Sequence, residues 1–204
     1  MNDSRALSVV GIGAGLGMIA LAVATSSRTV QRMDDTVERA VGPRRPRLAR
    51  AARIGTVPGE PYAHWPLGAT IAGVVLLQRG GPARRALVPM AGASLGAILT
   101  HHAVKAVYRR ARPRHAVLRG KTEPAYPSGH TADSTAVLAT GAYLLVREGI
   151  AEPRVVAPVV AVVALTVGAS RVALGWHWTS DVVGGWLTGI AVASGCAIAY
   201  ERLR

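Results

Sequence analysis

Apolar residues occur along the chain in long blocks, with neither the alternation of a half-buried strand nor the narrow stripe of a soluble surface helix. Each block carries almost no charge and has about the length that crosses a bilayer as a helix, about 20 residues. The blocks cover residues 6–25, 62–78, 86–104, 128–146, 155–170 and 182–200. This pattern predicts six transmembrane helices.

Six spans in 204 residues leave little chain for anything else. The predicted fold class is therefore all-α, a six-transmembrane-helix bundle that forms one membrane-embedded domain over residues 1–204. The longest connection, about residues 26–61, is rich in arginine with interspersed Val, Leu and Ile, which favours short interfacial helices between spans one and two. In such a bundle the first, third and fifth connections lie on one face.

The first block has a second interpretation. The small residues of "AVATSS" at positions 22–27 follow an apolar segment, as at the cleavage site of a secretory signal. A signal peptide would leave five spans, whereas the block is long enough to span a bilayer itself. We therefore interpret it as the first span.

Charge narrows the class of partner. Lys and Arg number 24 against 11 Asp and Glu, for a net charge of +13. The positive residues lie between spans, so anionic lipid headgroups or a phosphate substrate are expected as partners, and nucleic acid is not. The sequence contains no zinc-ligand spacing, phosphate-binding glycine loop or dinucleotide fingerprint. The lone Cys196 excludes an internal disulfide.

Three polar clusters lie where the same-face connections meet the spans, and ionisable groups there indicate function because they are costly in lipid. The first consists of Lys105, six intervening residues, and then Arg112-Pro113. Seven positions on a helix are nearly two turns, which allows both cations to point the same way, and Pro113 predicts that the helix ends at about Arg112. Taken alone, the cluster is also typical of basic residues that reach from a helix end to the interface.

The second cluster is "PSGH", which opens the fourth span. Ser128 is suited to cap the helix, and Gly129 lets a ligand approach the backbone. Helix N-termini bind anions, and His130 in the first turn can donate or accept a proton. Taken alone, a capped helix start explains most of the pattern.

The third cluster is "SRVALGWHWTSD", with Arg171, His177 and Asp181. The last two are four positions apart, so on a helix they stack on one face. A carboxylate there accepts a hydrogen bond from Nδ1 of the imidazole and leaves Nε2 free as nucleophile or base. A His–Asp pair that only caps the sixth span is the alternative.

Together and in this order, the motifs K-x6-RP, PSGH and SR-x5-H-x3-D resemble the type 2 phosphatidic acid phosphatase (PAP2) superfamily, in its membrane-integral lipid phosphatase branch. The resemblance implies catalytic motifs over residues 105–181 and a metal-independent, cofactor-free phosphatase. It implies that His177 attacks phosphorus, Asp181 orients it and His130 is the acid and base. The phosphate would be bound by Lys105, Arg112, Ser128, Gly129 and Arg171.

The expected activity is hydrolysis of a phosphomonoester or diphosphate of a lipid through a phosphohistidine. Candidate substrates are phosphatidic acid, phosphatidylglycerol phosphate, a polyprenyl diphosphate and a polyprenyl-phosphoribose phosphate. A lipid phosphotransferase with an alcohol acceptor is an alternative, and a non-catalytic membrane scaffold or transporter is another. The eight intact motif residues argue against the last.

Other features are less informative. His101 and Asp133 each lie one turn from a motif residue and either line the pocket or pack between helices, and Glu60 has no assigned role. Composition suggests a bacterial protein in the plasma membrane. More Lys and Arg lie on the site face than on the opposite face, which favours a cytoplasmic site, although many members of the family with this layout face outward. The sequence gives no oligomeric state.

Overall fold

The computed structural model describes residues 3–42, 46–80 and 85–204 of the chain, and these residues contain helices and no β-strand. Six of the helices are long, as the apolar blocks predict. They are α1 (Asp3–Ala24), α4 (Pro61–Arg79), α5 (Leu87–Val107), α7 (Gly129–Arg147), α8 (Pro153–Ala173) and α9 (Thr179–Leu203). The shorter elements are α2 (Arg28–Val41), α3 (Pro46–Gly55), the 3₁₀ helix η1 (Val57–Gly59) and α6 (Arg114–Leu118).

Within the described residues, four helical segments are long and apolar enough to cross a membrane: Ser4–Ala24, Leu87–Val107, Pro153–Ala173 and Thr179–Leu203. Helices α4 and α7 have the length of a span but carry more polar residues, among them His64 in α4 and Asp133 in α7. The protein is thus a multi-pass helical membrane protein, and the count of six spans stays a prediction.

The outer faces of the apolar helices are themselves apolar. Large hydrophobic side chains are exposed along α1 and α8, for example Ile12 at 64%, Leu16 at 62% and Val162 at 62%. Exposing such large apolar surfaces to water is unfavourable, whereas contact with lipid chains is not. The bundle is therefore built to be surrounded by lipid on these faces.

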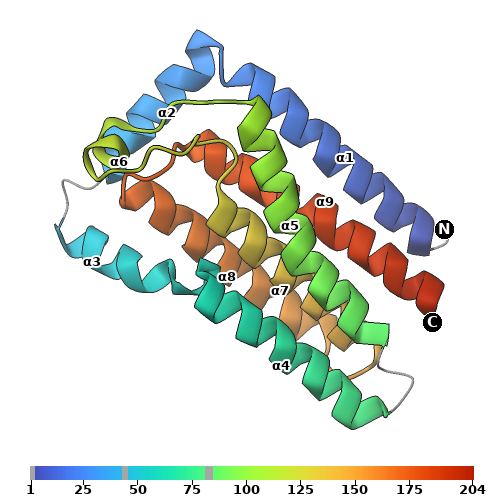
Figure 1. The fold of residues 1–204 in the computed structure, drawn as a ribbon. Coiled ribbons are helices and arrows are strands. Elements are labelled where there is room, and N and C mark those ends of the chain that lie inside the picture. Colours follow the sequence, from blue (N-terminus) through green and yellow to red (C-terminus); the bar gives the residue numbers. More distant parts are fainter. Residues whose placement is uncertain (1–2, 43–45, 81–84) are drawn as a thin grey trace.

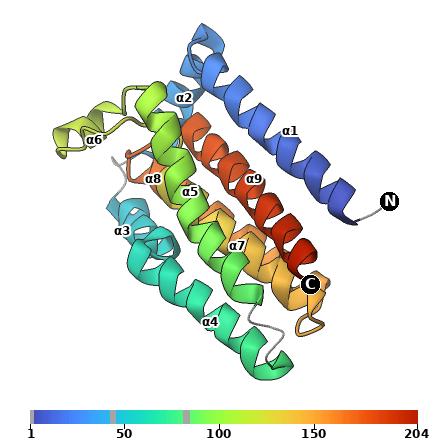
Figure 2. The ribbon, with the colours of Figure 1, turned by 45° about the vertical axis from the view of Figure 1, so that its right-hand side comes forward.

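Helices α7 and α9 form the centre of the bundle. Helix α7 packs against α4, α5, α8 and α9, and α9 packs against α1 and α5 as well (Figures 1 and 2). Small residues make this possible, since a Cβ at Gly189 of α9 would come within 2.5 Å of Thr135 Cβ and 2.8 Å of the Ala132 carbonyl oxygen in α7. Close backbone approach of this kind supplies the packing energy between helices in lipid.

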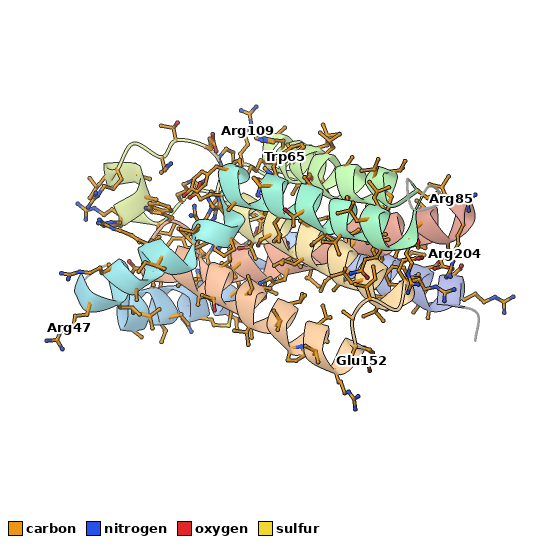
Figure 3. All side chains as sticks on the ribbon, turned by 90° about the horizontal axis from the view of Figure 1, so that it is seen from below. Arg47, Trp65, Arg85, Arg109, Glu152 and Arg204 are labelled. Carbon is orange, nitrogen blue, oxygen red and sulfur yellow. The ribbon has the colours of Figure 1, made fainter. Side chains whose placement is uncertain are left out.

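The two ends of the bundle differ. Both chain termini lie at one end, and α2, α3 and α6 lie at the other (Figure 1). Charged side chains mark both ends, with Arg47 toward one and Arg85 and Arg204 at the other (Figure 3). The first, third and fifth connections thus share one end of the bundle, as the sequence predicts.

Candidate active site

A cavity of about 420 Å³ lies at the end of the bundle that carries α2, α3 and α6. Six of the eight site residues predicted from the sequence line it: Lys105, Arg112, Gly129, His130, Arg171 and His177. Ser128 and Asp181 are fully buried behind this surface. The tertiary structure therefore brings residues from α5, α7, α8 and the flanking loops to one point.

Arg112 and His177 form the centre of this cavity wall. Arg112 NH1 lies 3.1 Å from His177 Nε2 and donates to the Trp176 carbonyl oxygen at 2.8 Å, while Arg112 Nε donates to the Glu123 carbonyl oxygen at 2.7 Å. Arg112 lies beyond the end of α5 at Val107, so its cation is held by these carbonyl groups, not by a continuous helix from Lys105. The helix therefore ends before the predicted point near Arg112, and the two cations do not share a helix, although both line the cavity.

His177 is buried and its imidazole is held neutral. Burial is the largest cause that lowers the pKa of His177 well below its usual value, and the nearby cations Arg112 and Arg171 lower it further. A neutral imidazole whose Nδ1 carries the proton has a lone pair on Nε2. This nitrogen lies on the side of Arg112, where an anionic phosphate would be drawn.

Asp181 contacts His177 from behind, with 3.4 Å between Asp181 Oδ2 and His177 Nδ1. His177 lies before the first turn of α9, so the two side chains do not stack on a helix as predicted. Instead, Asp181 is the third residue of α9 and turns back to accept from the backbone N–H of Trp178 at 2.9 Å. The carboxylate thus fixes the start of α9 and lies close to the imidazole.

A second carboxylate and an arginine support Asp181. Arg110 NH1 donates to Asp181 Oδ1 at 2.6 Å, and Arg110 NH2 donates to Asp34 Oδ2 at 2.7 Å. Asp34, on α2, is buried and accepts from the backbone N–H of Ser180 at 2.9 Å. Sequence reasoning missed Arg110 and Asp34, because nothing in the pattern distinguishes them from the other charges of two arginine-rich connections.

The PSGH segment is arranged differently from the prediction. Ser128 is the N-cap of α7 by backbone geometry, but its hydroxyl accepts from Thr131 Oγ1 at 2.9 Å and does not cap a backbone N–H. Ser128 is fully buried and is not among the residues that line the cavity, so its contact with phosphate stays a prediction. The Ser128 N–H donates to the Asp181 carbonyl oxygen at 2.9 Å, which joins the starts of α7 and α9.

His130 and Arg171 are both held by the segment between α3 and α4. His130 Nε2 lies 2.9 Å from Glu60 Oε1, and Arg171 NH1 donates to Thr56 Oγ1 at 2.8 Å. The guanidinium of Arg171 also lies over the ring of Trp176, 4.3 Å from its centroid. Glu60, which had no assigned role, and Thr56 are thus site residues that the sequence did not indicate.

Taken as chemistry, the cavity is lined by cations and imidazoles, among them Lys105, Arg112, Arg171, His130 and His177. Lys105, Arg112 and Arg171 neutralise an anion, and Lys105 Nζ is itself held by the Pro124 carbonyl oxygen. Among the described residues, no group of His, Cys, Asp and Glu is arranged to hold a metal ion. The fold and site define the class: a helical membrane protein with a cationic, histidine-bearing pocket at one end.

Comparison with known proteins identifies the family. The sequence profile of the PAP2 superfamily matches residues 86–204, more than half of the chain, so the protein belongs to the PAP2 superfamily. This confirms the resemblance carried by the three motifs.

Two relatives extend the match. Phosphatidylglycerophosphatase B of Bacillus subtilis (strain 168) is 34% identical over 95 residues, 45% of this chain and 47% of the relative, so the match spans about half the length of that curated protein. The crystal structure of "the first transmembrane PAP2 type phosphatidylglycerolphosphate phosphatase from Bacillus subtilis" superposes with a TM-score of 0.85 at 26% identity. That superposition covers 96% of this chain and 98% of the other, so the whole fold is shared.

Proposed function

We propose that the protein is a lipid phosphatase, a phosphoric ester hydrolase that removes a terminal phosphate from a membrane lipid without a metal ion. The observation that supports this most directly is the approach of Arg112 to His177 Nε2, at 3.1 Å, in a cavity shared with Lys105, Arg171 and His130. An anion bound between these cations lies against a neutral imidazole nitrogen, which is the geometry that nucleophilic attack on phosphorus requires.

The reaction we infer has two steps. His177 Nε2 attacks phosphorus, the bond to the leaving oxygen breaks, and His130 gives that oxygen a proton. A water molecule, whose proton passes to His130, then attacks phosphorus, the P–N bond breaks, and inorganic phosphate leaves. Asp181 stabilises the positive imidazole of the intermediate, and Lys105, Arg112 and Arg171 neutralise the phosphoryl oxygens throughout.

The membrane arrangement follows from the same reasoning. We infer that α4 and α7 span the bilayer with the four more apolar helices, since all six have 19 to 25 residues and run through one bundle. The polar residues of α7 are then mostly turned inward, as its buried Asp133, Ser134 and Thr135 are. Residues 1–204 form one domain in this proposal, and the membrane is the bacterial inner membrane.

The segment of α2 and α3 would lie at the membrane surface. Helix α3 exposes Leu48 and Ile54 beside basic residues such as Arg47, and α2 exposes Met33 beside its own arginines. Side chains of this kind suit the boundary between lipid headgroups and acyl chains. The substrate's phosphate would then enter the cavity at headgroup depth.

Phosphatidylglycerol phosphate is the substrate we propose, because the relatives above carry its phosphatase in their names. The test is release of inorganic phosphate from this lipid by purified protein in mixed micelles. Release should persist in excess chelator and fall at least about 10³-fold in His177→Ala, the scale of loss for a covalent nucleophile.

Wild-type release in His177→Ala would exclude the phosphohistidine mechanism. Transfer of phosphate to an added alcohol, in place of release, would favour the phosphotransferase. Exposed Asp35→Asn is a matched control, expected to leave release unchanged.

A further inference from the structure

A second set of polar residues lies one helical turn deeper than the catalytic residues. His101 precedes Lys105 by one turn on α5, Asp133 follows His130 by one turn on α7, and His64 follows Glu60 by one turn on α4. All three line the same cavity as the catalytic residues. We call His64, His101 and Asp133 the lower layer.

The side chains of the lower layer are buried, but several of their polar atoms have no hydrogen-bond partner among the described residues. His64 is 1% exposed, His101 6% and Asp133 8%. Within the part of the chain that the structure describes, His64 Nδ1 and Nε2, His101 Nδ1 and Asp133 Oδ1 have no hydrogen-bond partner. His101 Nε2 approaches Asp133 Oδ1, but at 3.4 Å. Buried polar groups without a partner destabilise a fold, so a cavity that keeps several of them open is suited to a polar ligand.

The charges of the cavity are divided between its two levels. The cations Lys105, Arg112 and Arg171 lie around His177, and the other two charged lining residues lie at the same level, Lys121 over the Trp176 ring and Glu123 beside Arg112. The lower layer holds a carboxylate and two imidazoles. A second phosphate group placed beside the buried Asp133 would be repelled, so the charge pattern excludes a diphosphate there. A neutral hydroxyl fits, because it can donate to a carboxylate oxygen and accept from an imidazole N–H at the same time.

We propose that the lower layer binds a free hydroxyl group on the alcohol that leaves, next to the scissile phosphate. This proposal rests on the function proposed above and adds the substrate class: a phosphomonoester of a polyol, such as a glycerol headgroup. Diacylglycerol and polyprenyl leaving groups carry no such hydroxyl and would leave the lower layer unpaired. Discrimination of this kind is strong because a site built to pair a hydroxyl is penalised when the hydroxyl is missing.

The wild-type protein can test this with two lipids. The first is phosphatidylglycerol phosphate, and the second is its deoxy analogue, in which the hydroxyl-bearing carbon of the terminal glycerol is CH₂. We expect kcat/KM to be about 10- to 100-fold lower for the deoxy analogue, the range for leaving a buried group without its partner. Equal kcat/KM for the two lipids would overturn the hydroxyl site and leave the phosphatase intact. No phosphate release from either lipid would instead refute the proposed function itself.

Variants of the lower layer test whether its side chains cause the preference for the lipid that carries the hydroxyl. His64→Leu removes two polar atoms at similar volume, and we expect it to lower kcat/KM for phosphatidylglycerol phosphate about 10-fold or more while changing the value for the deoxy analogue less than about threefold. His115→Leu, on α6 and outside the cavity, is the matched control and should preserve the ratio of the two substrates.

Asp133→Asn is the second variant, to be used if His64→Leu has a lowered melting temperature in detergent. The same selective loss is expected, because the amide offers only one oxygen and adds a competing donor. Equal losses on both lipids in a folded variant would show a packing role for the lower layer and overturn the proposal.

Discussion

At the scale of single residues, the site depends on burial as much as on identity. On a surface, His177 would titrate like other histidines, but here it is buried in the wall of the cavity. Arg112 lies next to its Nε2 and Asp181 lies on the side of its Nδ1. Burial and the cations act in the same direction on its charge. The residue is therefore neutral, as the proposed nucleophilic role requires.

This argument makes His177 resistant to protonation. Its pKa is lowered well below 6.5, so the neutral form should persist as the pH falls through the usual range for histidine. Histidine side chains labelled for NMR in detergent would show it: the signal that is missing in His177→Asn should not titrate between about pH 7.5 and 5.5. A midpoint near 6.5 would contradict the prediction. Replacing Arg112 by Gln should raise the midpoint, because Arg112 is one of the charges that lower it.

At the scale of elements, α2 links the segment expected at the membrane surface to the catalytic carboxylate. Asp34 on α2 binds Arg110, Arg110 binds Asp181, and both acids contact residues at the start of α9. The chain of charge-assisted bonds fixes where Asp181 lies relative to His177. Helix α2 therefore supports the position of Asp181 through Arg110.

Removing the charge of Asp34 tests this link. In Asp34→Asn the guanidinium of Arg110 loses one anionic partner, and Asp181 is less firmly positioned. We expect kcat to fall about 10- to 100-fold with little change in KM, since small misplacements of catalytic groups have effects of this size. Exposed Asp35→Asn, on the neighbouring position, is the control. A drop in melting temperature without a drop in kcat would mean that Asp34 only stabilises the fold.

Helix packing gives a prediction of its own. Gly189→Ala would push a methyl group into Thr135 Cβ and the Ala132 carbonyl oxygen of α7, whereas a Cβ at Gly195 on the same helix meets nothing within 4 Å. The first substitution should destabilise the bundle by about 1–3 kcal/mol. The second should be neutral or stabilise by up to about 1 kcal/mol, from higher helix propensity. Melting temperatures of both variants in one detergent measure the contrast, and equal values would contradict close packing of α7 on α9.

At the scale of the whole molecule, the candidate active site lies at one end of the bundle and both termini lie at the other (Figure 1). More basic residues lie at the end with the candidate active site than at the end with the termini. This predicts a cytoplasmic site and termini on the outer side of the membrane. The test is a fusion of the C-terminus to a reporter enzyme that works only on the outer side of the membrane. We expect this fusion to show reporter activity. An active cytoplasmic reporter at the same position would place the site outside.

The sequence by itself determined the helices and the chemistry. Runs of apolar residues fix where helices form in lipid, because every backbone group must be paired within its own segment. The residue types of the three motifs fix what can bind, because cations and an imidazole suit phosphate wherever the fold brings them together. All six predicted helices begin and end within a few residues of their apolar blocks for this reason, as α5 at Leu87–Val107 illustrates.

Only the tertiary structure decided how the site is supported. Three supporting contacts join residues that are 70 or more positions apart in the chain: Asp34 with Arg110, Thr56 with Arg171, and Glu60 with His130. No periodic pattern in the sequence indicates such contacts. The turned hydroxyl of Ser128 and the open polar atoms of the lower layer depend likewise on how α4, α5, α7 and α9 pack. A sequence states which groups are available, but hydrogen-bond pairing is a property of distance and direction, which packing alone sets.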